Sequence, residues 1–131
     1  GVGVAPAWTA GATQAQMEAA TSTVVAVTPA VAQYHPGVAK AWGNWNNAGS
    51  LSSSYNLTSV TDTGVGDHTA NLTTALSSAT NTGFLAGGDF NGFARVSITG
   101  AAAIRVVGTA PDTPFGATDL GAWALVVFGD Q

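Results

Sequence analysis

The sequence contains 131 residues, of which only 8% are charged, with 3 Lys and Arg against 7 Asp and Glu. The net charge of −4 argues against a nucleic-acid-binding protein, because phosphate groups are bound by clustered cations. There is no run of about 18 apolar residues, so no membrane insertion is expected, and the absence of Cys excludes disulfides. The scarcity of charge predicts a surface of small polar residues that is partly buried against copies of the same chain.

A short helix is predicted over residues 14–20. Thr13 and Gln16 have the spacing of a capping box, in which each side chain bonds the backbone N–H of the other residue. Residues 17–20 are helix formers, whereas the β-branched residues within 21–27 are expected to prevent the helix from extending further.

A second short helix is predicted to begin at Pro29. Thr28 can serve as its N-cap, Pro is favoured at the first helical position, and Pro36 and Gly37 are expected to end it. Helices of this length are not stable alone in water, so both require a partner surface.

From residue 38 onward, only strands and turns are predicted. The candidate strands span 38–46, 53–61, 67–74, 93–99, 102–107 and 121–128. The pattern Asp62-x-Gly-x-Gly-Asp67 predicts a hairpin between the second strand and the third. Short strands without helical spacers indicate an antiparallel β-sandwich or barrel. The last strand is almost wholly apolar, which indicates burial on both faces, within a sandwich or at a subunit interface. Residues 75–92 are predicted to be an irregular loop.

Three stretches carry a resemblance to a known family: Lys40-Ala41-Trp42, Asn44-Trp45-Asn46, and the run from Ser54 to Asp67. They resemble the C-terminal domains of tailed-bacteriophage fibre and spike proteins, over roughly residues 12–67. The sequence departs from the family pattern at Asn47, where relatives typically carry Gly, and at His68, where they typically carry Tyr.

The resemblance implies a fold and an assembly. It implies a jelly-roll-like antiparallel β-sandwich over 38–131, preceded over 1–37 by an extended segment and a short helical collar at which three chains form a homotrimer. The N-terminal segment would contact other virion proteins, and the domain would lie on the virion surface. The alternative is that the helices cap one end of a monomeric sandwich. The cations Lys40, Arg95 and Arg105 are candidates for pairing with Asp across subunits.

Residues typical of catalytic sites are sparse. The only histidines are His35 and His68, and no phosphate loop or zinc-binding His motif is present. Asp62 and Asp67 bracket one hairpin, and two carboxyl groups at the right separation can hydrolyse glycosides. We expect them instead to bond backbone N–H groups in the turn. No catalytic residue, metal or cofactor is therefore predicted.

Non-catalytic glycan binding remains as the predicted activity, since an aromatic ring can stack on a sugar while amide and carboxylate groups bond its hydroxyls. The candidate ligand-binding residues are Trp45, Asn46, Asn47, Asp89, Phe90 and Asn91. Trp42 is expected in the core. The predicted function is attachment of a phage or phage-like particle to a host surface glycan. The alternatives are a purely structural capsid-surface fibre or decoration protein and, third, a polysaccharide-degrading spike.

Overall fold

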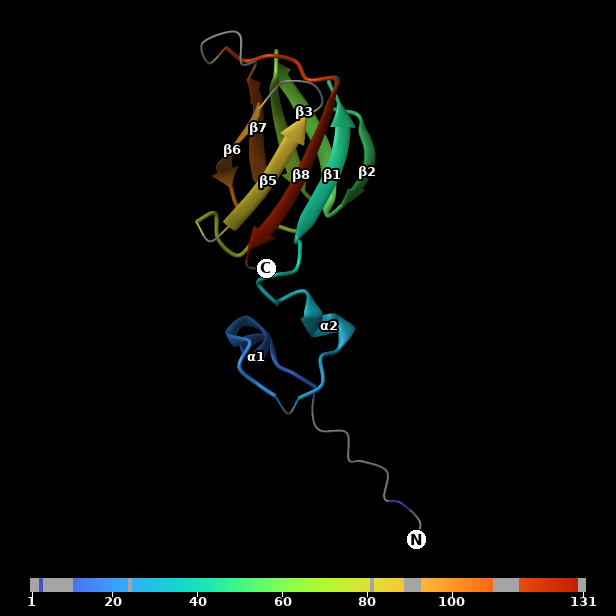
Figure 1. Cartoon of the computed structure of the whole chain (residues 1–131), viewed down its shortest axis with the longest axis vertical. Helices are drawn as coiled ribbons and strands as arrows, with labels where there is room; N and C mark the ends of the chain where they lie inside the picture. Colours follow the sequence, from blue (N-terminus) through green and yellow to red (C-terminus); the bar gives the residue numbers. More distant parts are fainter. Residues whose placement is uncertain are drawn as a thin grey trace. The chain divides into compact units, whose positions relative to one another are not determined.

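The computed structural model describes residues 3, 11–23, 25–80, 82–88, 93–109 and 116–129. The chain divides into two compact units, Gly1–Val38 and Ala39–Gln131, which we call the N-terminal unit and the β unit (Figure 1).

The first helix of the N-terminal unit, α1 (Gln14–Ala19), begins with the predicted capping box. Gln16 N donates to Thr13 Oγ1 at 3.3 Å, and Thr13 N donates to Gln16 Oε1 at 2.9 Å. The helix ends at Ala20, which adopts a left-handed conformation with φ of 49°. The prediction of this helix is confirmed within one residue.

The second helix, α2 (Pro29–Ala32), begins at Pro29 as predicted. Thr28 occupies the N-cap position, but its side chain makes no capping hydrogen bond. Outside the two helices, Ala12 N donates to Ala26 O at 2.9 Å, which ties the segment before α1 to the segment before α2.

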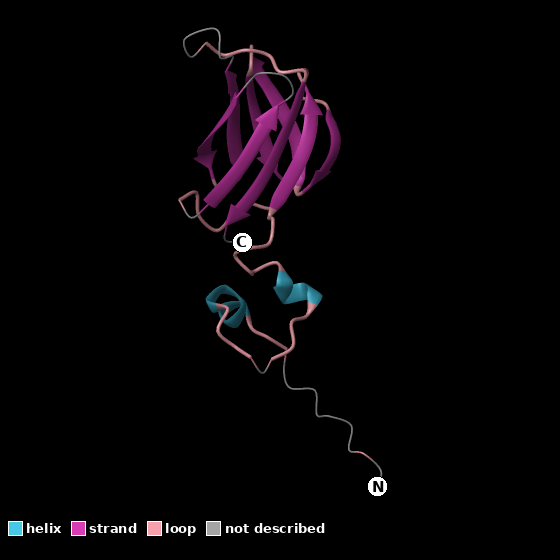
Figure 2. Ribbon diagram, viewed as in Figure 1, coloured by secondary structure: helices cyan, strands magenta, loops and turns pink. Residues whose placement is uncertain are grey.

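In its described residues, the β unit consists of two antiparallel sheets of four strands (Figure 2). Sheet I has the order β2 (Leu51–Tyr55), β1 (Ala41–Asn46), β8 (Ala122–Gly129), β5 (Thr82–Gly88). Sheet II has the order β3 (Leu57–Gly64), β4 (Asp67–Leu72), β7 (Ala103–Thr109), β6 (Phe93–Gly100). The predicted all-β class is confirmed, and so is the β3–β4 hairpin.

The hydrophobic core lies between the two sheets and draws on both. Sheet I contributes Ala41, Trp45, Trp123, Leu125 and Val127, and sheet II contributes Leu57, Ala70, Leu72, Ile104 and Val106. Every second residue of β1 and of β4 is buried, as expected for strands with one face on the core. In β8 the alternate residues Ala122 and Ala124 are exposed within the single chain.

The single strand predicted over 53–61 is wrong, because the chain changes sheets at Asn56. This residue has φ of 56°, a left-handed conformation that Asn tolerates better than most residues. Its Nδ2 donates to Lys40 O at 2.9 Å and to Thr74 O at 3.1 Å, and its Oδ1 accepts from Thr74 N at 2.7 Å. These bonds fix the corner between β2 and β3.

The irregular loop predicted over 75–92 is also wrong in part, because residues 82–88 form β5. This edge strand pairs antiparallel with β8. The sequence pattern does not predict it, because glycine has a low propensity for strands. Packing favours glycine at position 88, because a Cβ there would force the side chain of Leu120 to move.

Candidate functional site

The structure places Trp45 in the core, where it is 1% exposed. Its ring stacks parallel to that of Trp123, with centroids 6.4 Å apart, and His68 packs edge-on against both rings. Trp45 is buried because Ala41, Gly43 and Trp45 alternate on the inward face of β1. Its predicted role as a ligand-stacking residue is therefore wrong.

Asn46 and Asn47 hold the turn that follows β1. Asn46 Oδ1 accepts from the backbone N–H groups of Ala48 and Ser50, both at 3.0 Å. The carbonyl oxygen of Asn47 accepts from His68 Nε2 at 2.9 Å, and Asn47 Oδ1 accepts from Trp123 Nε1 at 3.1 Å. These oxygen atoms are therefore engaged in fixing the turn to the core. The other predicted site residues, Asp89, Phe90 and Asn91, lie outside the described residues.

Trp42 is the tryptophan of β1 that faces outward, contrary to the prediction that it is a core residue. Its side chain is 39% exposed, and its register partner on β2 is Tyr55, which is 50% exposed. We call Trp42 and Tyr55 the aromatic pair. The period-2 pattern of β1 could have predicted that Trp42 faces outward. The inward set Ala41, Gly43 and Trp45 lacks polar side chains, whereas Trp42 shares its set with two asparagines.

A second outward row lies beside the aromatic pair. It runs across sheet I through Ser53, Asn44, Ala124 and Gly87, which are register partners on neighbouring strands. Asn44 is exposed, and its side chain makes no hydrogen bond within the described part of the chain. Its amide can therefore donate and accept bonds to a ligand.

A shallow hollow of about 410 Å³ opens at the Gly87 end of this row. Its lining consists of Asn44, Gly87, Gly88, Ala122, Trp123 and Ala124. A volume of this size is within the range of small-molecule sites, ~300–1,000 Å³. We call the aromatic pair, Asn44, Ser53 and this hollow the binding face.

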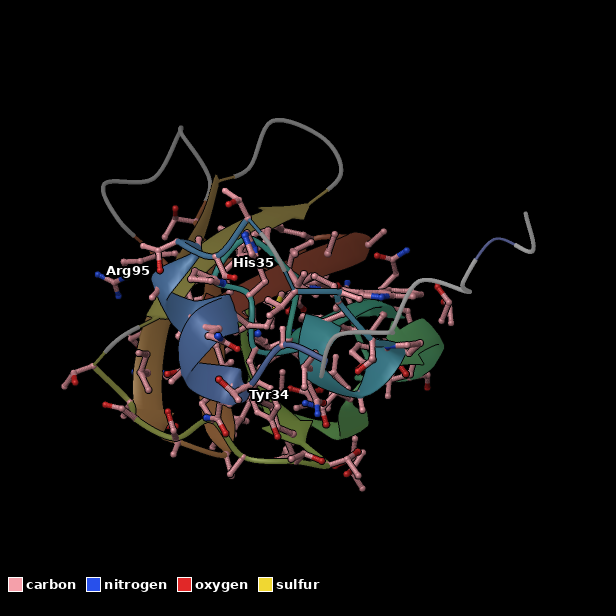
Figure 3. The ribbon with its side chains drawn as sticks, turned by 90° about the horizontal axis from the view of Figure 1, so that it is seen from below. Tyr34, His35 and Arg95 are labelled. Carbon is pink, nitrogen blue, oxygen red and sulfur yellow. The ribbon has the colours of Figure 1, made fainter. Side chains whose placement is uncertain are left out.

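The two sheets differ in charge. None of the four strands of sheet I contains Asp, Glu, Lys or Arg, whereas sheet II contains Asp62, Asp67, Arg95 and Arg105. Arg95 projects from β6 away from the sheet (Figure 3). The binding face is thus built on an uncharged sheet.

Arg105 forms an ion pair with Asp67 of the same chain, and its pairing across subunits stays a prediction. Its Nη2 lies 2.5 Å from Asp67 Oδ2, and its Nε donates to Asp67 Oδ1 at 2.9 Å. The hydrogen bond from Arg105 lowers the pKa of Asp67 below its ordinary value. Lys40, a further predicted pairing residue, is buried within the β unit at 1% exposure.

The carboxyl groups of the β3–β4 hairpin have structural partners. Asp62 Oδ1 accepts from Gly64 N at 3.0 Å, which confirms the predicted turn bond. A lowered pKa keeps Asp67 ionised, whereas the general acid of a glycosidase requires a raised pKa. Among the described residues, no group of three or more His, Cys, Asp and Glu side chains is placed to hold a metal ion.

The N-terminal unit has a smaller hollow of about 210 Å³, lined by residues in and beside α1, by the segment before α2 and by His35. His35 Nδ1 accepts from Gly37 N at 3.0 Å, in the turn that follows α2 (Figure 3). This bond gives His35 a local structural role.

No family model, curated protein or solved structure matches the chain. In the part of the chain that the structure describes, no helix is both long and apolar enough to cross a membrane.

Proposed function

We propose that this protein is a surface domain of a phage or phage-like particle, from a fibre or spike, that attaches the particle to its host by binding a glycan without catalysis. The binding face of sheet I is the proposed site. The observation that carries this proposal is the aromatic pair, two large rings exposed side by side next to the unbonded amide of Asn44.

The chemistry of the binding face suits a saccharide. Trp42 and Tyr55 offer rings on which the apolar C–H face of a sugar can stack, and stacking releases water from both surfaces. Asn44, Ser53 and the Tyr55 hydroxyl can each donate and accept hydrogen bonds, as sugar hydroxyls do. A shallow site of this kind binds weakly, so several copies on one particle would gain avidity.

The particle and the assembly belong to the same proposal. The resemblance of Lys40-Ala41-Trp42 and of residues 54–67 to phage fibre domains supports a virion surface location and a homotrimer, with the N-terminal unit as its collar and contact to other virion proteins. A jelly-roll-like sandwich is supported by the pairing of β1 with β8 in the middle of sheet I. The chain also crosses between the sheets after β2, β4, β5 and β7, as it does in β-sandwiches with Greek-key connections.

The test is a glycan array combined with binding to whole host cells, using the full chain with its mass measured by light scattering. Trp42→Ala and Tyr55→Ala should each abolish binding while the oligomer stays intact. Val65→Ala is the matched control, because Val65 is 66% exposed at the hairpin tip of sheet II, away from the binding face. Binding that survives both aromatic substitutions would exclude this face as the site.

A purely structural fibre or decoration protein is the second candidate function. The apolar character of the outward face of sheet I favours it, since another virion subunit can cover such a face. In that case neither glycans nor cells would be bound, and Trp42→Ala would dissociate the oligomer instead. A polysaccharide-degrading spike would instead lose activity in Asp62→Asn or Asp67→Asn with folding intact.

A further inference from the structure

We propose that the ligand of the binding face is a neutral oligosaccharide that lies across the strands of sheet I, from the aromatic pair toward the hollow at Gly87. This inference rests on the proposed function and specifies its ligand class and orientation.

The neutrality of the ligand follows from the composition of the sheet. Its four strands contain no charged side chain, so an acidic sugar would lose hydration on this face without gaining a counter-charge. The net charge of −4 further disfavours an anionic polymer. The polar groups that the face does offer, the Asn44 amide and the Ser53 and Tyr55 hydroxyls, are uncharged.

The orientation follows from the register. Tyr55, Trp42 and Val126 are register partners on β2, β1 and β8, so the apolar row runs across the strands. A ligand directed along β1 would instead pass from Trp42 to Asn44 and Asn46 and meet only one ring. Neighbouring strands are about 4.8 Å apart, which is close to the advance of a glycan chain per sugar ring. Consecutive rings can therefore lie over Tyr55 and Trp42.

The parallel row places hydrogen-bonding groups beside those rings. Ser53 pairs with Asn44, and Asn44 pairs with Ala124, which leads to Gly87 and the hollow. A Cβ built at Gly87 meets no atom within 4 Å, so the hollow is open above this residue. A further sugar ring, or a branch, can therefore enter it.

The experiment titrates the full chain with neutral oligosaccharides of increasing length, and with uronic-acid, sialylated and phosphorylated ones. We expect binding of neutral sugars only, with affinity that increases with length until the ligand spans the sheet. The dissociation constant should change less than about twofold between about 0.05 M and about 1 M NaCl, because screening acts on charge pairs.

Two matched variants test the hollow. Gly87→Leu should weaken the longer ligands at least about tenfold and leave the shortest unchanged, because the new side chain fills the hollow. Gly83→Leu is the control: Gly83 lies on the same strand with equally open space at its Cβ, but it does not line the hollow. Equal effects of both variants would overturn the orientation.

The remaining outcomes separate this inference from the proposed function. Salt-sensitive binding of anionic sugars that is lost in Trp42→Ala would overturn neutrality while leaving the binding face as a glycan site. Failure of every sugar to bind the folded chain would overturn the proposed function itself.

Discussion

The two sheets pack on one core, but their outward faces differ in whether the polar side chains have hydrogen-bond partners. On sheet II the polar side chains bond one another: Asn71 Nδ2 donates to Ser59 Oγ and to Thr61 Oγ1, both at 3.0 Å, and Arg105 pairs with Asp67. These side chains of sheet II therefore have hydrogen-bond partners within the chain before any ligand arrives.

Sheet I leaves corresponding groups unused. Asn44 lies on a central strand, as Asn71 does in sheet II, but its amide has no partner in the described part of the chain. Trp42 and Tyr55 add exposed apolar area, whose contact with water is unfavourable. A binding face can therefore be recognised by polar and aromatic groups that the fold positions but does not use.

Alanine substitution of the inward and of the outward tryptophan of β1 should change stability by very different amounts. Trp45→Ala should lower the free energy of unfolding by about 3–5 kcal/mol, because it leaves a cavity beside Trp123. Trp42→Ala should lower it by less than about 1 kcal/mol, as is usual at exposed positions. Denaturant unfolding of the two variants measures both effects.

A control refines this comparison. Trp45→Phe keeps an aromatic ring in the core and removes an indole N–H that has no partner among the described residues. It should therefore cost much less than Trp45→Ala. If Trp42→Ala were as destabilising as Trp45→Ala, the outward face of β1 would be part of the core and not a free surface.

The same strand shows how far the sequence predicts the structure. The alternation in residues 41–46 predicts a strand, but two tryptophans three positions apart must point to opposite faces. Which tryptophan is buried is indicated only by the residues that share its face of the strand: Ala41 and Gly43 for Trp45, and two asparagines for Trp42. The predicted site included Asn46 and Asn47, which follow Trp45, and these two asparagines instead hold the turn to the core.

Other errors arise where local propensity conceals tertiary structure. Asn56 sits in an alternating run, and its left-handed corner depends on bonds to Lys40 and Thr74, which are distant in sequence. The strand β5 contains glycines at 83, 87 and 88 and is stabilised by pairing with β8. The capping box of α1, by contrast, is a local interaction, and its residues predict it directly.

A smaller effect compares the two outward asparagines. Asn71→Ala should lower the free energy of unfolding by about 1 kcal/mol, because two hydroxyl acceptors lose their donor. Asn44→Ala should leave stability unchanged and weaken glycan binding. Unfolding curves and binding titrations on both variants measure stability and glycan affinity for each asparagine. A stability loss in Asn44→Ala equal to that in Asn71→Ala would remove the distinction between the two faces.

The smallest change in stability is expected for the Arg105–Asp67 ion pair of sheet II, since sheet I has no charged side chain in its strands. Because the bond from Arg105 lowers the pKa of Asp67 in the folded state, the ionised pair stabilises the fold above the unfolded pKa of Asp, about 3.9. That contribution is lost as the pH falls through the lower folded value. The loss should be less than the effect of Asn71→Ala, since the Arg105 side chain is 45% exposed and solvent screens the pair.

The measurement is the urea midpoint between neutral and acid pH. Asp67→Asn should flatten this part of the pH profile, and salt should do so partially. Asp62→Asn is the control, because Asp62 bonds the backbone of its own turn and leaves the Arg105 pair intact.

Glycan binding should stay constant over the pH range in which the β unit remains folded, because the binding face of sheet I has no charged side chain to titrate. If binding followed the protonation of Asp67, the two faces would be coupled through the core and could not be treated as separate surfaces.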